Sequence, residues 1–160
     1  MTQGNSTINK NIVILGGSYG GVSIAHYLLK HALPAFPQKE TYKIILISAA
    51  SEAMCRQACP RAPISDDFFP QAKLFVSIAK EFEQYSTDSF QFVQGFATTV
   101  DHIQRAVTIR TVDEQTQTLD FYALIIATGA STPSPLFGLN RDEKYLRKAW
   151  VSNIDVQSVC

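Results

Sequence analysis

NIVILGGSYGGVSIAHYLL, residues 11–29, is the stretch that decides the fold. Residues 11–15 form a short apolar run rich in β-branched side chains, as in a parallel strand that is buried on both faces. Glycines follow at 16, 17, 20 and 21. Apolar residues then recur at helical spacing over 22–32, and Pro34 and Pro37 end this segment. The stretch therefore predicts a strand, a glycine-rich turn and an amphipathic helix.

The rest of the chain continues this pattern into an α/β fold. Residues 42–47 read as a second buried strand, which completes a β-α-β unit. Short alternating segments separated by turn residues indicate a small antiparallel meander. The elements expected after the second strand are a long loop (48–70), a helix (72–85), strands at 90–93, 97–100, 106–112 and 118–121, an apolar strand (122–127) and a helix at 141–151.

These elements predict a Rossmann-like parallel sheet with a three-stranded antiparallel meander. We expect residues 1–10 to be disordered, residues 11–138 to form the nucleotide-binding domain, and residues 139–160 to be an atypical C-terminal tail. The length suits one domain with its own hydrophobic core.

The composition argues against two classes of binding partner, nucleic acids and membranes. Fourteen basic residues balance fourteen acidic ones, so the chain has no electrostatic footprint for nucleic acid or for an anionic membrane. The polar start lacks a signal core, and no apolar run is long enough to span a membrane. Three cysteines, an odd number, do not suggest a disulfide framework. We therefore expect a soluble protein of the reducing cytoplasm.

The glycine-rich turn has the chemistry of a phosphate site. In a dinucleotide fingerprint the first glycine permits a tight turn, the second lets the backbone approach the pyrophosphate, and the third lets helix and strand pack closely. Gly16 and Gly21 take the first and third places, and Ser18 takes the second. The positive end of the helix dipole attracts phosphate. The pattern thus predicts a dinucleotide pyrophosphate site.

Ser48 stands at the end of the second strand, where such motifs usually have an acidic residue for a ribose hydroxyl. A serine hydroxyl is a neutral and weaker partner. With Arg56 downstream, the site is also compatible with a 2′-phosphate and hence with NADP. Arg56 as a solvated loop residue is the simpler interpretation.

Four segments together resemble a known family. They are residues 12–22 (IVILGGSYGGV), 58–62 (ACPRA), 90–95 (FQFVQG) and 124–129 (LIIATG). In this order they resemble the apoptosis-inducing-factor-like flavoproteins, and more closely the fungal branch of the ferroptosis-suppressor type, within the pyridine nucleotide-disulfide oxidoreductase fold. The resemblance covers about residues 10–138. Serine is common in the middle of the turn in that branch, so Ser18 fits it.

The resemblance implies a FAD-binding domain of the glutathione-reductase type. NAD(P)H would give a hydride to FAD, and the reduced flavin would pass electrons to a quinone-like acceptor or to oxygen. The resemblance implies cofactor contacts at Gly16, Gly17, Ser18, Tyr19, Gly20, Gly21, Ser48, Arg61, Ala97, Ala127, Thr128 and Gly129. In this assignment Arg61 lies against FAD, the backbone of Ala97 contacts the adenine, and residues 127–129 close over the cofactor.

Family enzymes carry a second glycine-rich β-α-β unit for NAD(P)H and a later segment for the flavin ribityl chain. Neither is found before Cys160. We therefore expect the chain to be the first part of a split FAD domain, inactive alone, with self-association at unpaired sheet edges. The alternatives are a single-domain NADP-dependent reductase and a non-catalytic remnant or binding module.

Other reactive side chains give weaker signals. Cys55 and Cys59 are separated by three residues, whereas the redox pairs of disulfide reductases have four between them, so two ordinary thiols are the better interpretation. His26, His31 and His102 are expected to face solvent. The pair Asp66-Asp67 is expected to cap the following helix. No metal-ligand cluster and no catalytic triad or carboxylate pair is found in the sequence.

Overall fold

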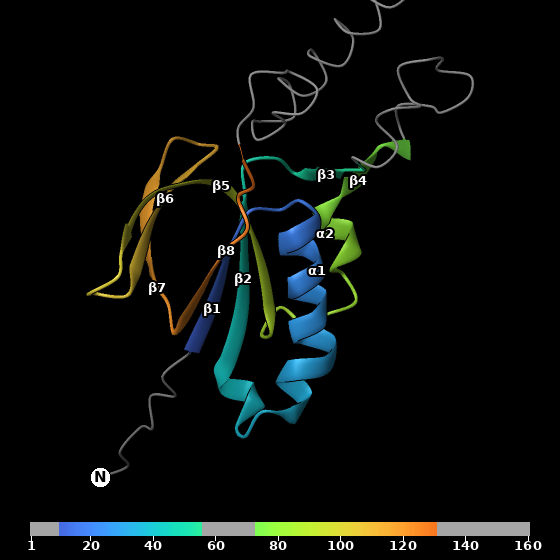
Figure 1. Cartoon of the computed structure of the whole chain (residues 1–160), viewed down its shortest axis with the longest axis vertical. Coiled ribbons are helices and arrows are strands. Elements are labelled where there is room, and N and C mark those ends of the chain that lie inside the picture. Colours follow the sequence, from blue (N-terminus) through green and yellow to red (C-terminus); the bar gives the residue numbers. More distant parts are fainter. Residues whose placement is uncertain (1–9, 56–72, 131–160) are drawn as a thin grey trace, which may run out of the picture.

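The computed structural model describes residues 10–55 and 73–130. Six strands form one sheet in the order β7-β6-β5-β2-β1-β8, and β3 pairs with β4 in a separate two-stranded sheet (Figure 1). The elements in chain order are β1 (Lys10–Leu15), α1 (Tyr19–Tyr27), a π-helical turn (Leu28–Ala32), 3₁₀ turns (Leu33–Ala35 and Lys39–Thr41), β2 (Tyr42–Ser48), β3 (Glu52–Met54), β4 (Phe75–Ser77), α2 (Ile78–Glu81), β5 (Phe90–Asp101), β6 (Ala106–Thr111), β7 (Thr116–Asp120) and β8 (Ala123–Ile126).

The parallel core of the sheet is buried on both faces, as its apolar runs predict. β1 pairs in parallel with β2 and β8, and β2 pairs in parallel with β5. Ile12 and Ile14 of β1 belong to the hydrophobic cluster that includes Ala25 of α1. Val13 and Leu15 point the other way and pack with residues of β6. Because side chains alternate along a strand, one short strand contributes to both halves of the core.

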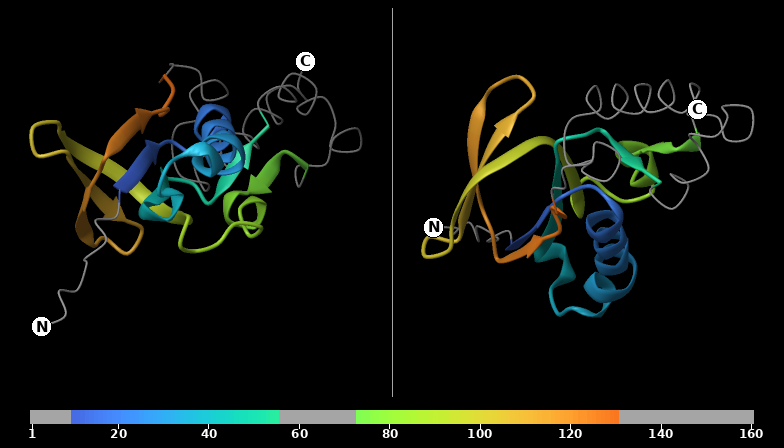
Figure 2. Two further views of the ribbon diagram at one scale, coloured as in Figure 1. Left: turned by 90° about the horizontal axis from the view of Figure 1, so that it is seen from below. Right: turned by 45° about the horizontal axis from the view of Figure 1, so that its top comes forward.

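β5 joins the parallel core to the meander. Its first part pairs in parallel with β2, and from Gly95 onward it pairs antiparallel with β6, which pairs with β7. Figure 2 shows the antiparallel strands β5, β6 and β7 on the opposite side of the parallel strands from α1. The predicted fold class is confirmed: an α/β fold with a Rossmann-like parallel sheet and a three-stranded antiparallel meander. The prediction of separate strands at 90–93 and 97–100 is wrong, because β5 is continuous and absorbs an irregularity between Ala97 and Thr99.

The predicted helix at 72–85 is also wrong over most of its length. Phe75–Ser77 is the strand β4, which pairs with β3, and α2 covers only Ile78–Glu81. Apolar residues at short spacings fit a helix and a strand almost equally well, and pairing with Glu52–Met54 decides for the strand. β3 itself lies in the segment predicted to be an irregular loop.

His26 does not face solvent as predicted. Its ring stacks on Phe82, with centroids 4.1 Å apart and planes 10° apart, and its Nδ1 lies 3.0 Å from the hydroxyl of Tyr85. The residues after α2 fold back over this side of α1 and cover it. His31 and His102 are exposed, as predicted.

Several sequence-based predictions lie outside the described residues. They concern residues 1–9, Arg56, Cys59, Arg61, Asp66, Asp67, the tail at 139–160 and the helix at 141–151. The division of the chain into domains therefore stays a prediction. In the part of the chain that is described, no helix has the length and apolar character needed to cross a membrane.

Candidate functional site

The glycine-rich turn connects the carboxyl end of β1 to the start of α1. Gly16 donates its N–H to the carbonyl oxygen of Ile47 at 2.8 Å, which fixes the turn to β2. The φ of Gly16 is +111°, a value that side chains with a Cβ rarely adopt. A Cβ at Gly21 would overlap the carbonyl oxygen of Gly16. The geometric roles predicted for these two glycines, a tight turn and a close contact between helix and strand, are confirmed.

Ser18 is the N-cap residue of α1, but its side chain makes no capping hydrogen bond. The first turn of α1 also contains no acidic residue. The amide groups at this helix end and the hydroxyl of Ser18 therefore face no carboxylate of their own helix. Such an arrangement suits an anionic group, because the first N–H groups of a helix lack intrahelical partners and carry the positive end of its dipole.

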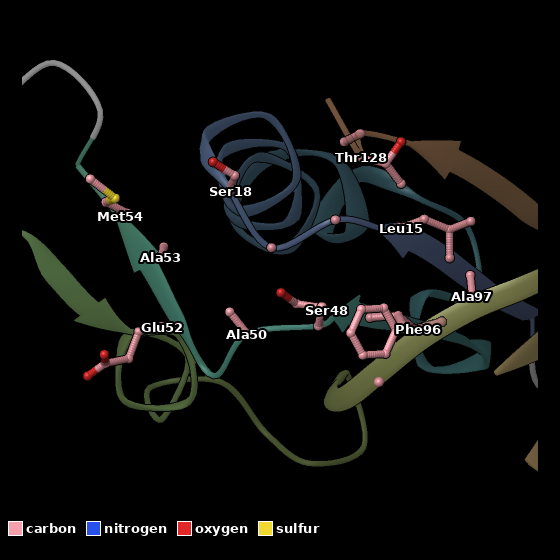
Figure 3. A pocket seen from close by; sticks show the side chains of 16 residues that line it. Leu15, Ser18, Ser48, Ala50, Glu52, Ala53, Met54, Phe96, Ala97 and Thr128 are labelled. Carbon is pink, nitrogen blue, oxygen red and sulfur yellow. The ribbon is translucent and has the colours of Figure 1, made fainter. Parts of the chain in front are cut away.

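A hollow opens beside this turn, where the carboxyl ends of neighbouring strands meet (Figure 3). In open parallel sheets this edge is the usual ligand site. The hollow is lined by residues 15–18 at the end of β1 and in the turn after it, 47–50 at and after the end of β2, 52–54 of β3, 95–97 of β5, and 127–128 after β8.

Ser48 lies inside this hollow, at the last position of β2. It is 7% exposed, and its hydroxyl makes no hydrogen bond to the part of the chain that the structure describes. Its Cβ and Oγ lie next to the Cα of Gly17, so close that a Cβ on Gly17 would be 2.5 Å from either atom. A buried hydroxyl without a partner costs free energy, and a polar ligand atom in the hollow would relieve that cost.

The other predicted contact residues lie around the same turn. Ala97 lines the hollow from β5. Ala127 and Thr128 follow β8, and the N–H of Ala127 donates to the carbonyl oxygen of Leu15 at 2.8 Å. Together with Gly129, whose φ is +74°, they line a second hollow against the first turn of α1. Arg61 lies outside the described residues. The structure brings the other predicted contact residues together: Gly16, Gly17, Ser18, Tyr19, Gly20, Gly21, Ser48, Ala97, Ala127, Thr128 and Gly129.

Sequence reasoning missed part of the lining. Phe96 lies next to Ala97 in the hollow, and the β3 residues contribute Glu52 and Met54. The signal for Phe96 was available, because it adjoins a residue already assigned to the site. Nothing in the sequence around Glu52 indicated a strand that returns to the glycine turn.

Cys55 comes close to the glycine turn. Its Sγ lies 3.4 Å from the hydroxyl of Tyr19, in the first turn of α1. Within residues 10–55 and 73–130, no three His, Cys, Asp or Glu side chains gather as the ligands of a metal ion would.

Residues 10–153 match the pyridine nucleotide-disulphide oxidoreductase family. The chain is 57% identical over 150 residues to oxidoreductase phnG of Penicillium herquei, and the aligned part covers 94% of this chain and 36% of that protein. It is 37% identical over 126 residues to oxidoreductase ptaL of Pestalotiopsis fici, covering 79% of this chain and 33% of that protein. The chain thus spans about a third of the length of these curated relatives.

Solved structures share the fold. A reduced CoADR-RHD of Bacillus anthracis superposes with a TM-score of 0.68 at 18% identity, covering 94% of this chain and 27% of that one. The sulfide:quinone oxidoreductase of Aquifex aeolicus gives a TM-score of 0.65 at 20% identity, covering 94% and 32%. NDH2 of Plasmodium falciparum, solved with RYL-552, gives 0.66 at 18% identity, covering 95% and 30%.

Proposed function

The chain belongs to the pyridine nucleotide-disulphide oxidoreductase family, and we propose that it binds FAD as the first part of an NAD(P)H-dependent flavoprotein oxidoreductase. In the proposed complex, the turn at 16–21 holds the pyrophosphate, Ser48 meets the adenosine ribose, and Ala97 contacts the adenine. Residues 127–129 close over the cofactor, and Arg61 lies against it. The bound flavin supplies the redox chemistry by accepting a hydride and passing electrons onward.

The observation that carries the proposal is the pair of serine side chains around the turn. Ser18 does not cap its helix, and the buried hydroxyl of Ser48 has no hydrogen-bond partner in the described residues. Both line the hollow at the carboxyl ends of β1 and β2. A phosphate oxygen at Ser18 and a ribose hydroxyl at Ser48 would provide the two missing hydrogen bonds. The residues present therefore fit a dinucleotide.

The choice of FAD over NADP rests on the segments outside the turn. The antiparallel meander and the Ala127-Thr-Gly129 end of β8 accompany a FAD site in the proteins that the sequence resembles. A single NADP-binding reductase, with Ser48 and Arg56 at a 2′-phosphate, is the alternative. It gives no role to the meander. Within the family we assign the chain to the apoptosis-inducing-factor-like, ferroptosis-suppressor type on the same segments.

The electron acceptor follows from the same assignment. We propose a quinone-like molecule or oxygen as the acceptor, as the resemblance to the apoptosis-inducing-factor-like flavoproteins implies. The 160 residues contain one glycine-rich strand–turn–helix fingerprint, which we assign to FAD. We therefore expect them to have no NAD(P)H oxidase activity by themselves. The neutral net charge gives nucleic acid no electrostatic footprint, and we propose the reducing cytoplasm as the compartment because three cysteines do not suggest a disulfide framework.

The test is titration of the purified chain with FAD, followed by the visible flavin spectrum and by equilibrium dialysis. We expect saturable binding of FAD, weaker binding of NADPH, and no NADH oxidation. The variant Ser18→Ala should bind FAD about 3- to 10-fold more weakly, the size of one lost hydrogen bond.

Ser23→Ala is the matched control, because Ser23 is an exposed serine on the same helix away from the hollow. It should leave FAD binding unchanged. A folded chain that takes up no FAD would overturn the proposal, and a preference for NADPH would favour the single-domain reductase. Rapid NADH oxidation by the 160 residues alone would show that the nicotinamide site lies within them.

A further inference from the structure

Three residues of β5 pass the carboxyl end of β2, and within residues 10–55 and 73–130 no strand pairs with them on that edge. The last residue pair between the two strands is Ser48 with Gln94, and from Gly95 onward β5 pairs with β6 on its other side. A Cβ at Gly95 would lie 2.6 Å from the carbonyl oxygen of Arg110, so the glycine permits this close approach. Gly95, Phe96 and Ala97 are thus presented to the hollow at the end of β2.

Phe96 is the one aromatic side chain in the described lining of this hollow. It is 40% exposed, and among the described residues it makes no ring contact of the kind found for Phe36, Phe82 and Phe90. The lining also contains several small residues, among them Ala49, Ala50 and Ala97. Figure 3 shows the ring next to Ser48, at the end of the hollow away from Met54. An exposed aromatic ring next to small residues leaves room for a flat group against it.

We propose that the ring of Phe96 stacks on the adenine of the bound dinucleotide. This inference rests on the proposed function, in which the turn at 16–21 holds the pyrophosphate. From that turn the hollow extends to the end of β2, the position that takes the adenosine ribose in this type of fold. A base attached to a ribose at Ser48 therefore reaches the open edge of β5.

The chemistry of this corner suits a neutral base. The residues that line the hollow at β5 carry no charge, and Arg110, the cross-strand partner of Phe96, forms an ion pair with Glu114 at 3.7 Å. Stacking of a base on an aromatic side chain does not require a charged partner, since every base has a π-face. The unpaired edge of β5 supplies backbone groups for the rim of the base, and Phe96 supplies its face.

The test measures the binding of FAD, ADP and FMN to the chain and to variants at position 96. ADP contains adenine without flavin, and FMN contains flavin without adenine. Phe96→Ala should weaken the binding of FAD and of ADP by the same factor, about 5- to 100-fold, and should leave the affinity for FMN unchanged. Phe96→Tyr keeps the aromatic face and should bind ADP like the parent chain. Phe96→Leu keeps only the apolar volume, so its affinity for ADP should lie between those of the parent chain and Phe96→Ala.

Val100→Ala is the matched control, because Val100 is 39% exposed on the same strand and does not line the hollow. It should bind all three ligands normally. If the parent chain binds FAD and Phe96→Ala binds FAD and ADP equally well, the stacking role is wrong while the proposed function stands. If Phe96→Ala loses FMN as strongly as ADP, the ring contacts something other than adenine. A folded parent chain that binds neither FAD nor ADP would remove both proposals.

Discussion

Gly17 and Ser48 lie so close together that a Cβ on Gly17 would be 2.5 Å from both Cβ and Oγ of Ser48. This contact brings the phosphate turn after β1 against the last residue of β2. Gly17 therefore fixes the predicted pyrophosphate contact relative to the predicted ribose contact. Gly17 is not one of the three glycine positions of the fingerprint. The same Cβ would lie 2.7 Å from Cδ1 of Ile78, at the start of α2.

The first prediction follows from this contact. Gly17→Ala should lower the free energy of unfolding by about 1–3 kcal/mol, because overpacking of a tight site forces the backbone or its neighbours to shift. It should weaken FAD binding as well, since Ser48 is displaced. Urea unfolding followed by circular dichroism measures the first effect, and a FAD titration measures the second.

Gly20→Ala is the matched control for stability. A Cβ at Gly20 would meet only the Cβ of Ala127, at 3.7 Å, which is an ordinary contact. Because alanine favours a helix over glycine, this variant should be equally stable or up to about 1 kcal/mol more stable. Equal losses of stability in both variants would show that the contact with Ser48 is not what Gly17 provides.

The second prediction concerns the buried hydroxyl of Ser48, whose stability and binding effects should have opposite signs. Removal of a buried hydroxyl that lacks a partner relieves a desolvation cost. Ser48→Ala should therefore leave the free energy of unfolding unchanged or raise it by up to about 1 kcal/mol. The same variant should bind FAD about 3- to 10-fold more weakly, because the ribose loses a hydrogen bond. A clear loss of stability with unchanged FAD affinity would assign the hydroxyl a structural role instead.

The central β-α-β unit was predictable because its signals are local. The apolar run before Gly16 can be buried on both faces only as an inner strand, and the spacing after Gly21 is that of a helix. The fingerprint residues and the Ala127-Thr-Gly129 segment lie more than a hundred residues apart in the chain. Only the family resemblance indicated that both belong to one site. The structure places β8 beside β1 and thereby brings these segments together.

The errors arise where tertiary contacts override local patterns. Residues 75–77 have apolar spacings that suit a helix, yet they pair with Glu52–Met54, a partner that no local signal indicates. The sequence predicts that residues 94–96 separate two strands, but β5 runs through them, and Gly95 leaves room inside the strand for the carbonyl oxygen of Arg110. His26 lies on the face of the helix that the sequence predicts to be polar and exposed, but Phe82 and Tyr85, which follow α2, cover it.

The third prediction tests the contacts of His26. The stack on Phe82 and the hydrogen bond with Tyr85 together should contribute to stability, so His26→Ala should lower the free energy of unfolding by about 1–3 kcal/mol. His31→Ala, an exposed histidine in the next helical turn, is the control and should change it by less than about 0.5 kcal/mol. His26→Phe retains the stack and should recover part of the loss. If His26→Ala and His31→Ala have the same stability, the ring stack contributes nothing measurable.

The fourth prediction concerns the two outer strands of the main sheet, which differ in character. In the described part of the chain β7 and β8 are the edges of this sheet. β7 reads TQTLD, with polar and acidic residues that discourage pairing with another chain, whereas β8 reads ALII. Ile126 at the end of β8 is 68% exposed. An uncharged apolar edge of this kind favours self-association, and β8 is where we expect two copies of these 160 residues to meet.

Ile126→Lys should therefore shift the 160-residue chain from dimer toward monomer in sedimentation velocity, by at least about tenfold in the dissociation constant, because pairing would bury the ammonium group without a partner. Ile103→Lys is the matched control. Ile103 is 76% exposed in the turn between β5 and β6 and belongs to neither edge strand, so its substitution should leave the association unchanged. Two results would contradict the assignment: a parent chain that stays monomeric at high concentration, or equal dissociation by both lysine variants. The second result would mean that added positive charge, rather than the edge of β8, controls the association.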